Sequence, residues 1–384
     1  MVSHPRGTLR SAAVLLIAMA IALTAMPASQ PASAAEEILL GALLPLTGPA
    51  APTGVAEQRG VQFAVARANS KGGVRGHQVK MFYEDSQGKP DQGMLSFNRL
   101  VDLHRVQVML TAFSSVSLAI APLGTRQKIL IINPAAQSSD LDGASPYLLN
   151  TIPTVRDEAR ALAKFVVEKL KLKTTTIIYE NASAGITGRD DFKQVFLALG
   201  GKVLSEEPTE FGQTNYRPTL LKAAATKPDF VYISMTQGWV PFAEQVGQIP
   251  NFPLGVGPTF MSPLFGYPST LGWYASRVRS EITPDLQAEY AKMFPGVVSQ
   301  SEVQAGVMGF FEREYFNSTN IVLRAIDKVL GDKGEVTGEA VRKAIYDIGT
   351  FEGVDRITFE KDKNTAVRVI EVYRFDKDKK TPMQ

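Results

Sequence analysis

The sequence predicts an α/β protein with two similar lobes, each containing a parallel sheet flanked by helices. Short apolar runs alternate with amphipathic segments along the chain, as is typical of right-handed βαβ units. This alternation breaks at residues 145–159, "SPYLLNTIPTVRDEA", and then begins again. The 384 residues are also enough for two domains of ~100–200 residues each.

Residues 1–35 are expected to be a secretory signal peptide rather than a membrane anchor. Arg6 and Arg10 precede the apolar run "SAAVLLIAMAIALTAM", and small residues then lead to an A-x-A cleavage site at Ala32-Ser33-Ala34. The apolar run is shorter than the ~20 residues of a spanning helix. The chain has no cysteine for a lipid anchor or a disulfide. The mature protein is therefore expected to be soluble in the periplasm.

In the first lobe, strands and helices are expected to alternate from the start of the mature chain. The strands are expected in "ILLGALLPL", "HQVKMFYED", "VQVMLTAF" and "ILIINPA". The helices are expected in "GVAEQRGVQFAVARANSKGG", "QGMLSFNRLVDLH" and "VSLAIAPLGTRQK". Continuous apolar strands of this kind are buried on both faces of a parallel sheet.

The second lobe is expected to repeat this order. Its strands are expected in "TTTIIYEN", "KVLSEEP" and "DFVYISM", and its helices in "ARALAKFVVEKL", "GRDDFKQVFLALGG", "YRPTLLKAAAT" and "WVPFAEQVGQI". A mostly helical region then runs from "PDLQAEYAKMF" to "VRKAIYDIG".

Several function classes are disfavoured by the composition and the motifs. Without Arg6 and Arg10, the 41 basic residues become 39 against 38 acidic ones, which argues against a nucleic-acid partner. His77 and His104 are too far apart in sequence to suggest a metal site, and "GVGPTF" lacks the third glycine of a dinucleotide fingerprint. "NASAG", with Ser183, lacks the first glycine of a nucleophile elbow, and no histidine follows His104. We therefore expect no enzyme activity, no metal and no cofactor.

The stretch "LTAFSSVSLAIAP" places Ser114 and Ser115 where a strand passes into a helix. This is the carboxyl edge of the sheet, where α/β folds bind ligands. The first turn of a helix has unpaired N–H groups that attract an anion. The residues alone leave two interpretations open: a plain N-cap serine, or a contact to a carboxylate.

The segments "ILLGALLPLTGPAAPTGVAEQRGVQFAVARANSKGGVRGHQVKMFYEDSQGKPDQG" and "SSVSLAIAPLGTRQKILIINPAAQSSDL" resemble the leucine/isoleucine/valine-type substrate-binding proteins of bacterial ABC transporters. The resemblance continues through "IIYENASAGITGRDDF", "LGGKVLSEE" and "KPDFVYISM". It implies the type I periplasmic-binding-protein fold, with a ligand cleft between lobes that are joined by a three-stranded hinge. The lobes are then residues 36–153 plus 283–352 and residues 154–282 plus 353–384. The implied partners are a small-molecule ligand and an inner-membrane permease, with the receptor a monomer.

The resemblance also implies which residues contact the ligand. The family position matching Ser114 touches the ligand carboxylate, and Phe113 matches a neighbouring contact. Thr53 falls where the family often has a bulky aromatic lid, so a longer ligand has room. The remaining expected contacts lie at strand ends and in the loops facing the cleft: Ser115, Ala135, Ala136, Gln137, Tyr179, Thr236, Gln237, Trp239 and Phe260.

The resemblance fails at the pocket for an ammonium group. Amino-acid binders of the family carry acids where this chain has Val155 and Gly257, although a shifted alignment brings Asp157 or Glu158 into the first place. A buried ammonium needs such partners. We therefore expect a carboxylate ligand with an apolar or aromatic body and no α-amino group. The alternatives are a branched-chain amino acid or amide binder of the same family, a ligand-sensing regulatory subunit, and an exported hydrolase acting through Ser183.

Overall fold

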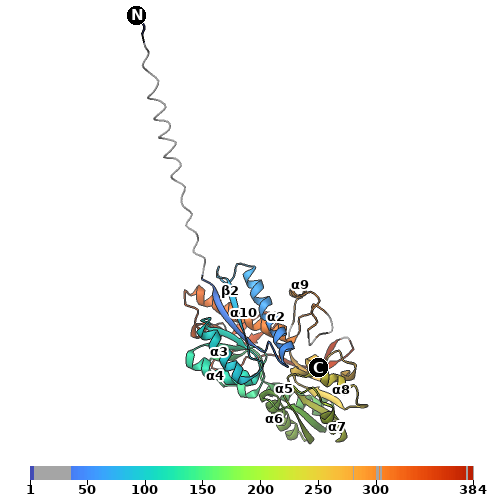
Figure 1. Cartoon of the computed structure of the whole chain (residues 1–384). Coiled ribbons are helices and arrows are strands. Elements are labelled where there is room, and N and C mark those ends of the chain that lie inside the picture. Colours follow the sequence, from blue (N-terminus) through green and yellow to red (C-terminus); the bar gives the residue numbers. More distant parts are fainter. Residues whose placement is uncertain (4–35, 280, 300–301, 303–304, 378, 384) are drawn as a thin grey trace. The chain divides into compact units, whose positions relative to one another are not determined.

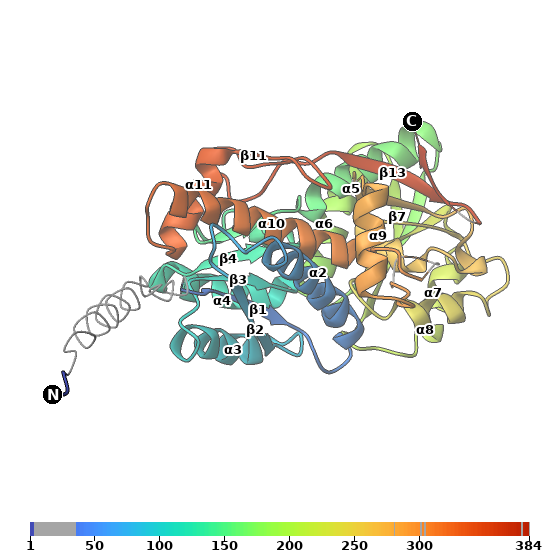
Figure 2. The ribbon, with the colours of Figure 1, turned by 90° about the horizontal axis from the view of Figure 1, so that it is seen from above.

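The fold is built on two large sheets, seen in the computed structural model in Figures 1 and 2. The structure describes residues 1–3, 36–279, 281–299, 302, 305–377 and 379–383. The expected signal peptide, apart from residues 1–3, lies outside the described residues. Within the described part of the chain, no helix combines the length and the apolar character needed to span a membrane.

The first sheet has five parallel strands in the order β2-β1-β3-β4-β5. Its strands are β1 (Ile38–Leu44), β2 (Val79–Asp85), β3 (Val108–Thr111), β4 (Leu130–Asn133) and β5 (Leu148–Asn150). The helices that follow in this part are α2 (Ala51–Asn69), α3 (Pro90–Asp102) and α4 (Ser114–Gln127). From the later chain come α9 (Pro284–Met293), α10 (Phe310–Gly331), α11 (Gly338–Ile348) and the hairpin of β11 (Thr350–Phe351) and β12 (Ile357–Thr358).

Both faces of the first sheet are buried by helices. Leu110 and Ile132 pack in one core with α2, α10 and α11, whereas Met109 and Ile131 pack in another with α3 and α4. Successive strand residues point to opposite faces, which explains why these strands are apolar without interruption. Figures 1 and 2 both show α2 lying beside α10, and the two helices are in extensive contact.

The second sheet has seven strands in the order β14-β13-β10-β9-β8-β6-β7. They are β6 (Thr174–Glu180), β7 (Lys202–Thr209), β8 (Phe230–Ser234), β9 (Leu254–Gly257), β10 (Tyr274–Val278), β13 (Ile370–Phe375) and β14 (Lys380–Met383). The five neighbouring strands β10, β9, β8, β6 and β7 are parallel. Strand β13 pairs antiparallel with β10, and β14 pairs antiparallel with β13. The helices are α5 (Val155–Lys164), α6 (Ser183–Ala198), α7 (Arg217–Ala225) and α8 (Trp239–Val246).

The second sheet is also covered on both faces. Ile177 and Tyr232 pack with α5 and α6, whereas Ile178 and Ile233 pack with α7 and α8. Short helical turns complete the chain: η1 (Ser139–Leu141), η2 (Phe165–Lys169), η3 (Thr259–Leu264) and η4 (Pro268–Thr270). The predicted α/β class, with parallel sheets flanked by helices, is confirmed.

The chain passes between the two sheets three times, and the last passage lies later than the sequence predicts. The hairpin of β11 and β12 keeps the chain with the first sheet beyond residue 353, because Ile357, Phe359 and Ala366 belong to the core of that sheet. The next strand, β13, pairs with β10 of the second sheet. The passage therefore lies around Val367–Val369 and includes Arg368.

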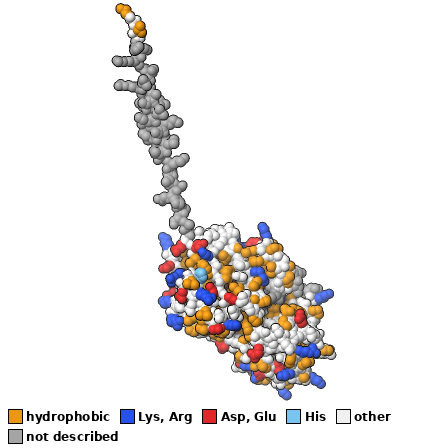
Figure 3. Space-filling model, in the orientation of Figure 1, with side chains coloured by type: hydrophobic (Ala, Val, Ile, Leu, Met, Phe, Trp, Pro, Cys, Tyr) orange, Lys and Arg blue, Asp and Glu red, His pale blue; other side chains and the backbone are white. Residues whose placement is uncertain are grey.

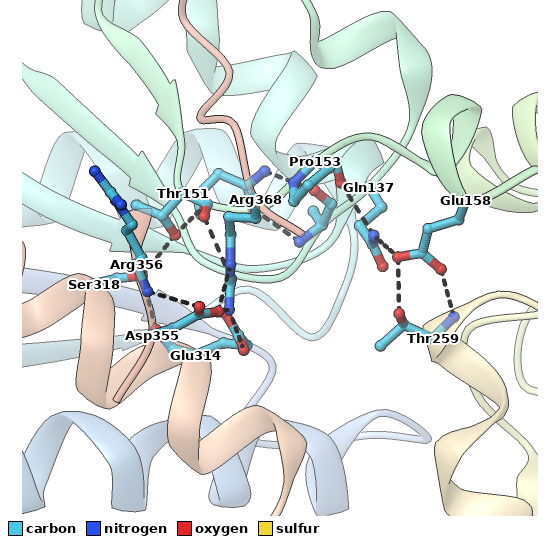
Figure 4. A network of polar contacts seen from close by, with 12 residues as sticks. Gln137, Thr151, Pro153, Glu158, Thr259, Glu314, Ser318, Asp355, Arg356 and Arg368 are labelled. Atoms are coloured by element: carbon cyan, nitrogen blue, oxygen red, sulfur yellow. Dashed lines mark hydrogen bonds and ion pairs between the residues drawn. The ribbon is translucent and has the colours of Figure 1, made fainter. Parts of the chain in front are cut away.

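Arg368 connects this last passage to the rest of the first lobe (Figure 4). Its guanidinium is fully buried and forms ion pairs with Glu314 of α10 and with Asp355. Nη1 also donates a hydrogen bond to the carbonyl of Thr151, on the first passage, over 3.4 Å. One side chain thus joins two of the three passages to α10.

Glu158 plays the corresponding role on the side of the second lobe (Figure 4). The buried carboxylate accepts hydrogen bonds from Gln137 Nε2 at 2.5 Å, Thr259 N at 2.6 Å and Ser276 Oγ at 2.6 Å. These donors come from the loop after β4, from η3 and from β10. Glu158 therefore holds the start of α5 against both lobes.

Figure 3 shows that charged side chains of both signs are interspersed over the visible face of the molecule. Many of the described ion pairs join exposed side chains, such as Lys128 and Glu339. Exposed pairs of this kind contribute little to stability. The buried pairs of Arg368 are the ones expected to matter.

We predict that Arg368→Met lowers the free energy of unfolding by roughly 3–5 kcal/mol, because it leaves Glu314 and Asp355 buried without their cation. Urea unfolding measures the change. The control is Arg356→Met, since the exposed Arg356 side chain has its described ion pair with exposed Glu352. Equal unfolding midpoints for the two variants would contradict the structural role of Arg368.

Candidate functional site

A pocket lies between the carboxyl edges of the two sheets. It encloses about 510 Å³, part of which is open to solvent. Its lining combines four phenylalanines, four alanines, five hydroxyl side chains and one carboxyl group. These are Thr53, Glu57, Phe113, Ser114, Ser115, Ala135, Ala136, Ala182, Ser183, Ala184, Phe211, Thr236, Phe260 and Phe311. This composition is typical of small-molecule sites, which are mostly apolar with a few polar groups.

The start of α4 brings Ser114 and Ser115 to the pocket. The first hydrogen bond of this helix runs from Ser117 N to Phe113 O over 2.9 Å, so the N–H groups of residues 114–116 precede it. Ser114 Oγ accepts a hydrogen bond from Ser138 N over 3.1 Å. This bond uses a lone pair and leaves the hydroxyl proton for donation to a ligand.

The start of α6 faces the same pocket from the second lobe. Its first hydrogen bond runs from Ile186 N to Ala182 O over 2.9 Å, so the N–H groups of residues 183–185 precede it. Ser183 Oγ donates to Ser138 Oγ over 2.8 Å, a contact between the lobes. Two helix N-termini, each with a partial positive charge, therefore border one small space.

Phe113 joins β3 to α4 in an unusual backbone conformation, with φ 63° and ψ 133°. A positive φ is unfavourable for a bulky L-residue and is concentrated at functional sites. Here it turns the chain so that the first N–H groups of α4 and the Phe113 ring both border the pocket.

Aromatic rings close the pocket from both lobes. The Phe113 ring meets the Phe211 ring edge-on, with centroids 5.7 Å apart. A Cβ at Gly88 would lie 3.1 Å from Phe211 Cζ, and a Cβ at Gly212 would lie 3.2 Å from Pro49 Cγ. The loop after β7 therefore packs directly on the first lobe, and the two lobes are in contact over the pocket.

Glu57 supplies the one carboxyl group among the described lining residues. It lies on α2, one helical turn after Thr53, and is 2% exposed. Burial raises the pKa of Glu57 to about 8, and the negative charge of Glu312 acts in the same direction. At neutral pH this carboxyl group is therefore mostly uncharged.

Eight of the twelve residues that were expected to contact the ligand line the pocket, and the other four lie elsewhere. Lining the pocket are Thr53, Phe113, Ser114, Ser115, Ala135, Ala136, Thr236 and Phe260. Gln137 is fully buried, and its amide donates to Glu158 and to the Pro153 carbonyl instead. Gln237 and Trp239 line a neighbouring recess that meets the pocket at Thr53. The Tyr179 ring packs under Arg189, whose Cζ lies 4.4 Å from its centroid.

None of the four positions considered for an ammonium pocket lines the space. Asp157 is exposed and forms an ion pair with Arg160 over 3.7 Å. The Glu158 carboxylate accepts hydrogen bonds from Gln137, Thr259 and Ser276. Val155 is buried in the second core. A Cβ at Gly257 would lie 2.5 Å from Ile233 O, so no side chain fits there without a shift.

Six further lining residues were not expected as ligand contacts: Glu57, Ala182, Ser183, Ala184, Phe211 and Phe311. Helical spacing from Thr53 could have indicated Glu57, because residues four apart share a helix face. The end of the strand in "TTTIIYEN" could likewise have indicated Ser183. Phe311 begins α10, far along the chain, and no local signal connects it to the pocket.

Comparisons with known proteins agree with this architecture. The sequence profile of the periplasmic binding proteins matches residues 37–380. The chain belongs to the periplasmic binding protein family. The predicted resemblance to this family is thereby confirmed.

Individual members of the family resemble the chain at modest identity. A Leu/Ile/Val-binding protein of Rhizobium johnstonii is 29% identical over 197 residues, which cover 51% of this chain and 54% of that protein. The chain thus spans about half the length of this relative and of several others that it matches.

Two solved structures illustrate the shared fold. A solute-binding protein of an ABC transporter from Rhodopseudomonas palustris, in complex with 3,4-dihydroxybenzoic acid, has a TM-score of 0.77 at 20% identity and covers 88% of this chain and 93% of its own. A branched-chain amino acid transporter substrate-binding protein from Streptococcus pneumoniae, in complex with isoleucine, has a TM-score of 0.75 at 17% identity, with 90% and 99% covered. These likenesses show the type I periplasmic binding protein fold.

We predict that Phe211→Ala weakens ligand binding with little loss of stability, because the ring closes the pocket from a half-buried loop position. Loss of one aromatic pair is worth ~0.5–1.5 kcal/mol, or roughly two- to tenfold in affinity. The control is Phe252→Ala, which removes a ring that packs on Trp273 away from the pocket. Calorimetric titration should show weaker binding only for the first variant, and equal effects would contradict the closing role of Phe211.

Proposed function

We propose that this chain is the solute receptor of an ABC importer, captures a small carboxylate-bearing ligand between its lobes, and delivers it to a membrane permease. The ligand has an apolar or aromatic body and no α-amino group. The observation that carries the proposal is the composition of the pocket. Two helix N-termini with hydroxyl side chains and four phenylalanine side chains line the same space. Membership of the periplasmic binding protein family supports the role of receptor and the periplasmic location.

The first turn of α4 is the proposed carboxylate site. It offers the Ser114 and Ser115 hydroxyls together with the free N–H groups at the start of the helix. No lysine or arginine is among the described lining residues, so hydroxyl donors and the helix dipole would bind the charge. Each helix terminus contributes ~0.3–1 kcal/mol, up to ~2 kcal/mol when partly buried, and each hydrogen bond to a charged group ~1.5–3 kcal/mol.

The phenylalanines are the proposed contacts for the ligand body. Phe113 and Phe311 come from the first lobe, and Phe211 and Phe260 come from the second. A ligand that touches both pairs favours the closed arrangement, since its contacts with the second lobe are lost on opening. The ligands of the two solved relatives, an aromatic acid and an aliphatic amino acid, both have such apolar bodies.

The second candidate is a branched-chain amino acid, as the relatives suggest. Glu57 would then have to bind the ammonium group. Against this, the Glu57 carboxyl group is neutral at pH 7 in the free protein. No observation on the described residues favours a regulatory subunit. Hydrolysis by Ser183 lacks a histidine base, since neither described histidine lines the pocket.

A matched ligand panel tests the proposal by thermal shift. Benzoate and 4-methylpentanoate should stabilise the protein, because each places a carboxylate on an apolar body. A ligand at 100 times its Kd adds about 2.7 kcal/mol. Leucine differs from 4-methylpentanoate by its ammonium group and should stabilise less, and benzamide, which lacks the charge, should stabilise less than benzoate. Leucine as the strongest ligand would favour the second candidate, and failure of every carboxylate would refute the proposal.

We predict that Ser114→Ala weakens benzoate binding roughly tenfold or more, because a hydrogen bond to a charged group is lost. Ser117→Ala is the matched control on the same helix, since Ser117 Oγ donates to the Phe113 carbonyl and does not line the pocket. Calorimetric titration gives the affinities, and urea unfolding reports the stability of both variants. Unchanged affinity in Ser114→Ala would make this serine only part of the helix start.

A further inference from the structure

One carboxyl oxygen of Glu57 lacks a hydrogen-bond partner among the described residues. Glu57 lines the pocket from α2 with 2% of the residue exposed. No described residue gives its Oε2 a hydrogen-bond partner. Buried polar atoms in native proteins nearly always have partners, so an unpartnered oxygen in the wall of a binding pocket indicates a group of the ligand.

The packing of α2 on α10 buries this carboxyl group. Gly60 allows the two helices to approach closely, because a Cβ there would lie 2.3 Å from the Glu312 carbonyl oxygen. The approach places Glu57 against Tyr315 and Glu312 of α10. Arg59, on the same helix as Glu57, pairs with Glu312 over 2.6 Å, and Ser299 Oγ also donates to Glu312 over 2.8 Å. The arginine therefore neutralises Glu312 rather than Glu57.

The Tyr315 hydroxyl proton is not available to Glu57. The Tyr315 hydroxyl donates to the Thr111 carbonyl oxygen over 2.7 Å, and a phenol has a single proton. Burial then favours the protonated form of Glu57, because it raises the pKa of this carboxyl group. The Glu57 Oε2 of the protonated acid is an uncharged acceptor without a partner among the described residues.

We propose that Glu57 serves as a neutral carboxylic acid whose Oε2 accepts a hydrogen bond from a hydroxyl group of the ligand. The preferred ligand class is then a hydroxy-substituted carboxylate, with its carboxylate at the start of α4 and its hydroxyl group at Glu57. This inference rests on the proposed function and specifies the ligand further. An uncharged acceptor suits an alcohol or phenol, whereas an ammonium group requires an ionised partner.

Burial is the main cause that keeps Glu57 protonated. Burial raises the pKa of Glu57 to about 8, so that the acid is mostly protonated at pH 7. The titratable groups facing it are Tyr315 and Glu312 of α10, with Arg59 of α2 held by Glu312.

The test compares wild type, Glu57→Gln and Glu57→Met by calorimetric titration at pH 7 with benzoate, 3-hydroxybenzoate and 4-hydroxybenzoate. Wild type should bind at least one hydroxybenzoate roughly two- to tenfold more tightly than benzoate. Glu57→Gln should keep this preference, because its amide can donate to Tyr315 while its carbonyl oxygen accepts from the ligand. Glu57→Met has similar length and no acceptor, so it should lose the preference and still bind benzoate.

Each other outcome has a defined meaning. A preference that survives in Glu57→Met, or that is absent in wild type while benzoate still binds, overturns this inference and leaves the proposed function intact. If the preference is lost in Glu57→Gln as well as in Glu57→Met, the inference that Glu57 acts as a neutral acid is overturned. If wild type binds none of the three carboxylates, the proposed function fails and this inference fails with it. Circular dichroism and urea unfolding establish that both variants are folded.

A pH series gives an independent prediction. Ionisation of Glu57 above pH 8 adds a negative charge to the pocket, so the affinity of wild type for benzoate should fall between pH 7 and 9.5, whereas that of Glu57→Gln should stay level. Stability should follow the same proton. Because the folded pKa lies above the usual 4.5, the unfolded chain releases the proton first, and the Tm of wild type should fall relative to Glu57→Gln as pH rises from 4.5 to 8. Parallel profiles for the two proteins would contradict a titrating Glu57.

Discussion

The carboxyl edges of two parallel sheets border one pocket, and this constraint determines where the chemistry of the protein can lie. Each sheet is covered by helices on both faces, so side chains within the strands are used for packing. Polar groups that can meet a ligand are left to the loops and to the first turns of helices. The starts of α4 and α6 are therefore the natural place for binding a negative charge, because their N–H groups have no partner within the helix.

The proposed capture of a ligand between the lobes requires the lobes to keep their register. The polar contacts at the passages between them meet that requirement. Arg368 joins the last passage to α10 and to the carbonyl of Thr151, and Glu158 joins the loop after β4 to η3 and β10. Both are buried and have several partners, so removing either leaves groups that cannot find water. Over the pocket, Phe113 and Phe211 join the two lobes through a contact between apolar rings.

Sequence reasoning reached the parts of the fold and the site that depend on local patterns. Alternating apolar runs predicted both sheets, and the passage from strand to helix predicted the place of Ser114 and Ser115. It missed what depends on packing between distant segments. Gln137 lies in a segment that was expected to line the pocket, but its side-chain amide donates a hydrogen bond to Glu158 instead. Phe311 joins the pocket from a helix that begins far along the chain. The last passage between lobes was placed too early, because the pairing of β11 with β12 was not evident.

Glu57 shows how packing far from the ligand can decide what charge a pocket accepts. An ionised Glu57 about 5 Å from a bound carboxylate would repel it by roughly 3 kcal/mol at an effective dielectric constant of ~20. That is comparable to what one helix terminus and one hydrogen bond contribute, so an ionised Glu57 would cancel much of the binding free energy of an anion. The pocket has no described cation to offset the charge. Keeping the acid neutral depends on its burial, and its burial depends on the close approach of α2 and α10 at Gly60. The proposed carboxylate site at the start of α4 would thus depend on Gly60, one helical turn after Glu57.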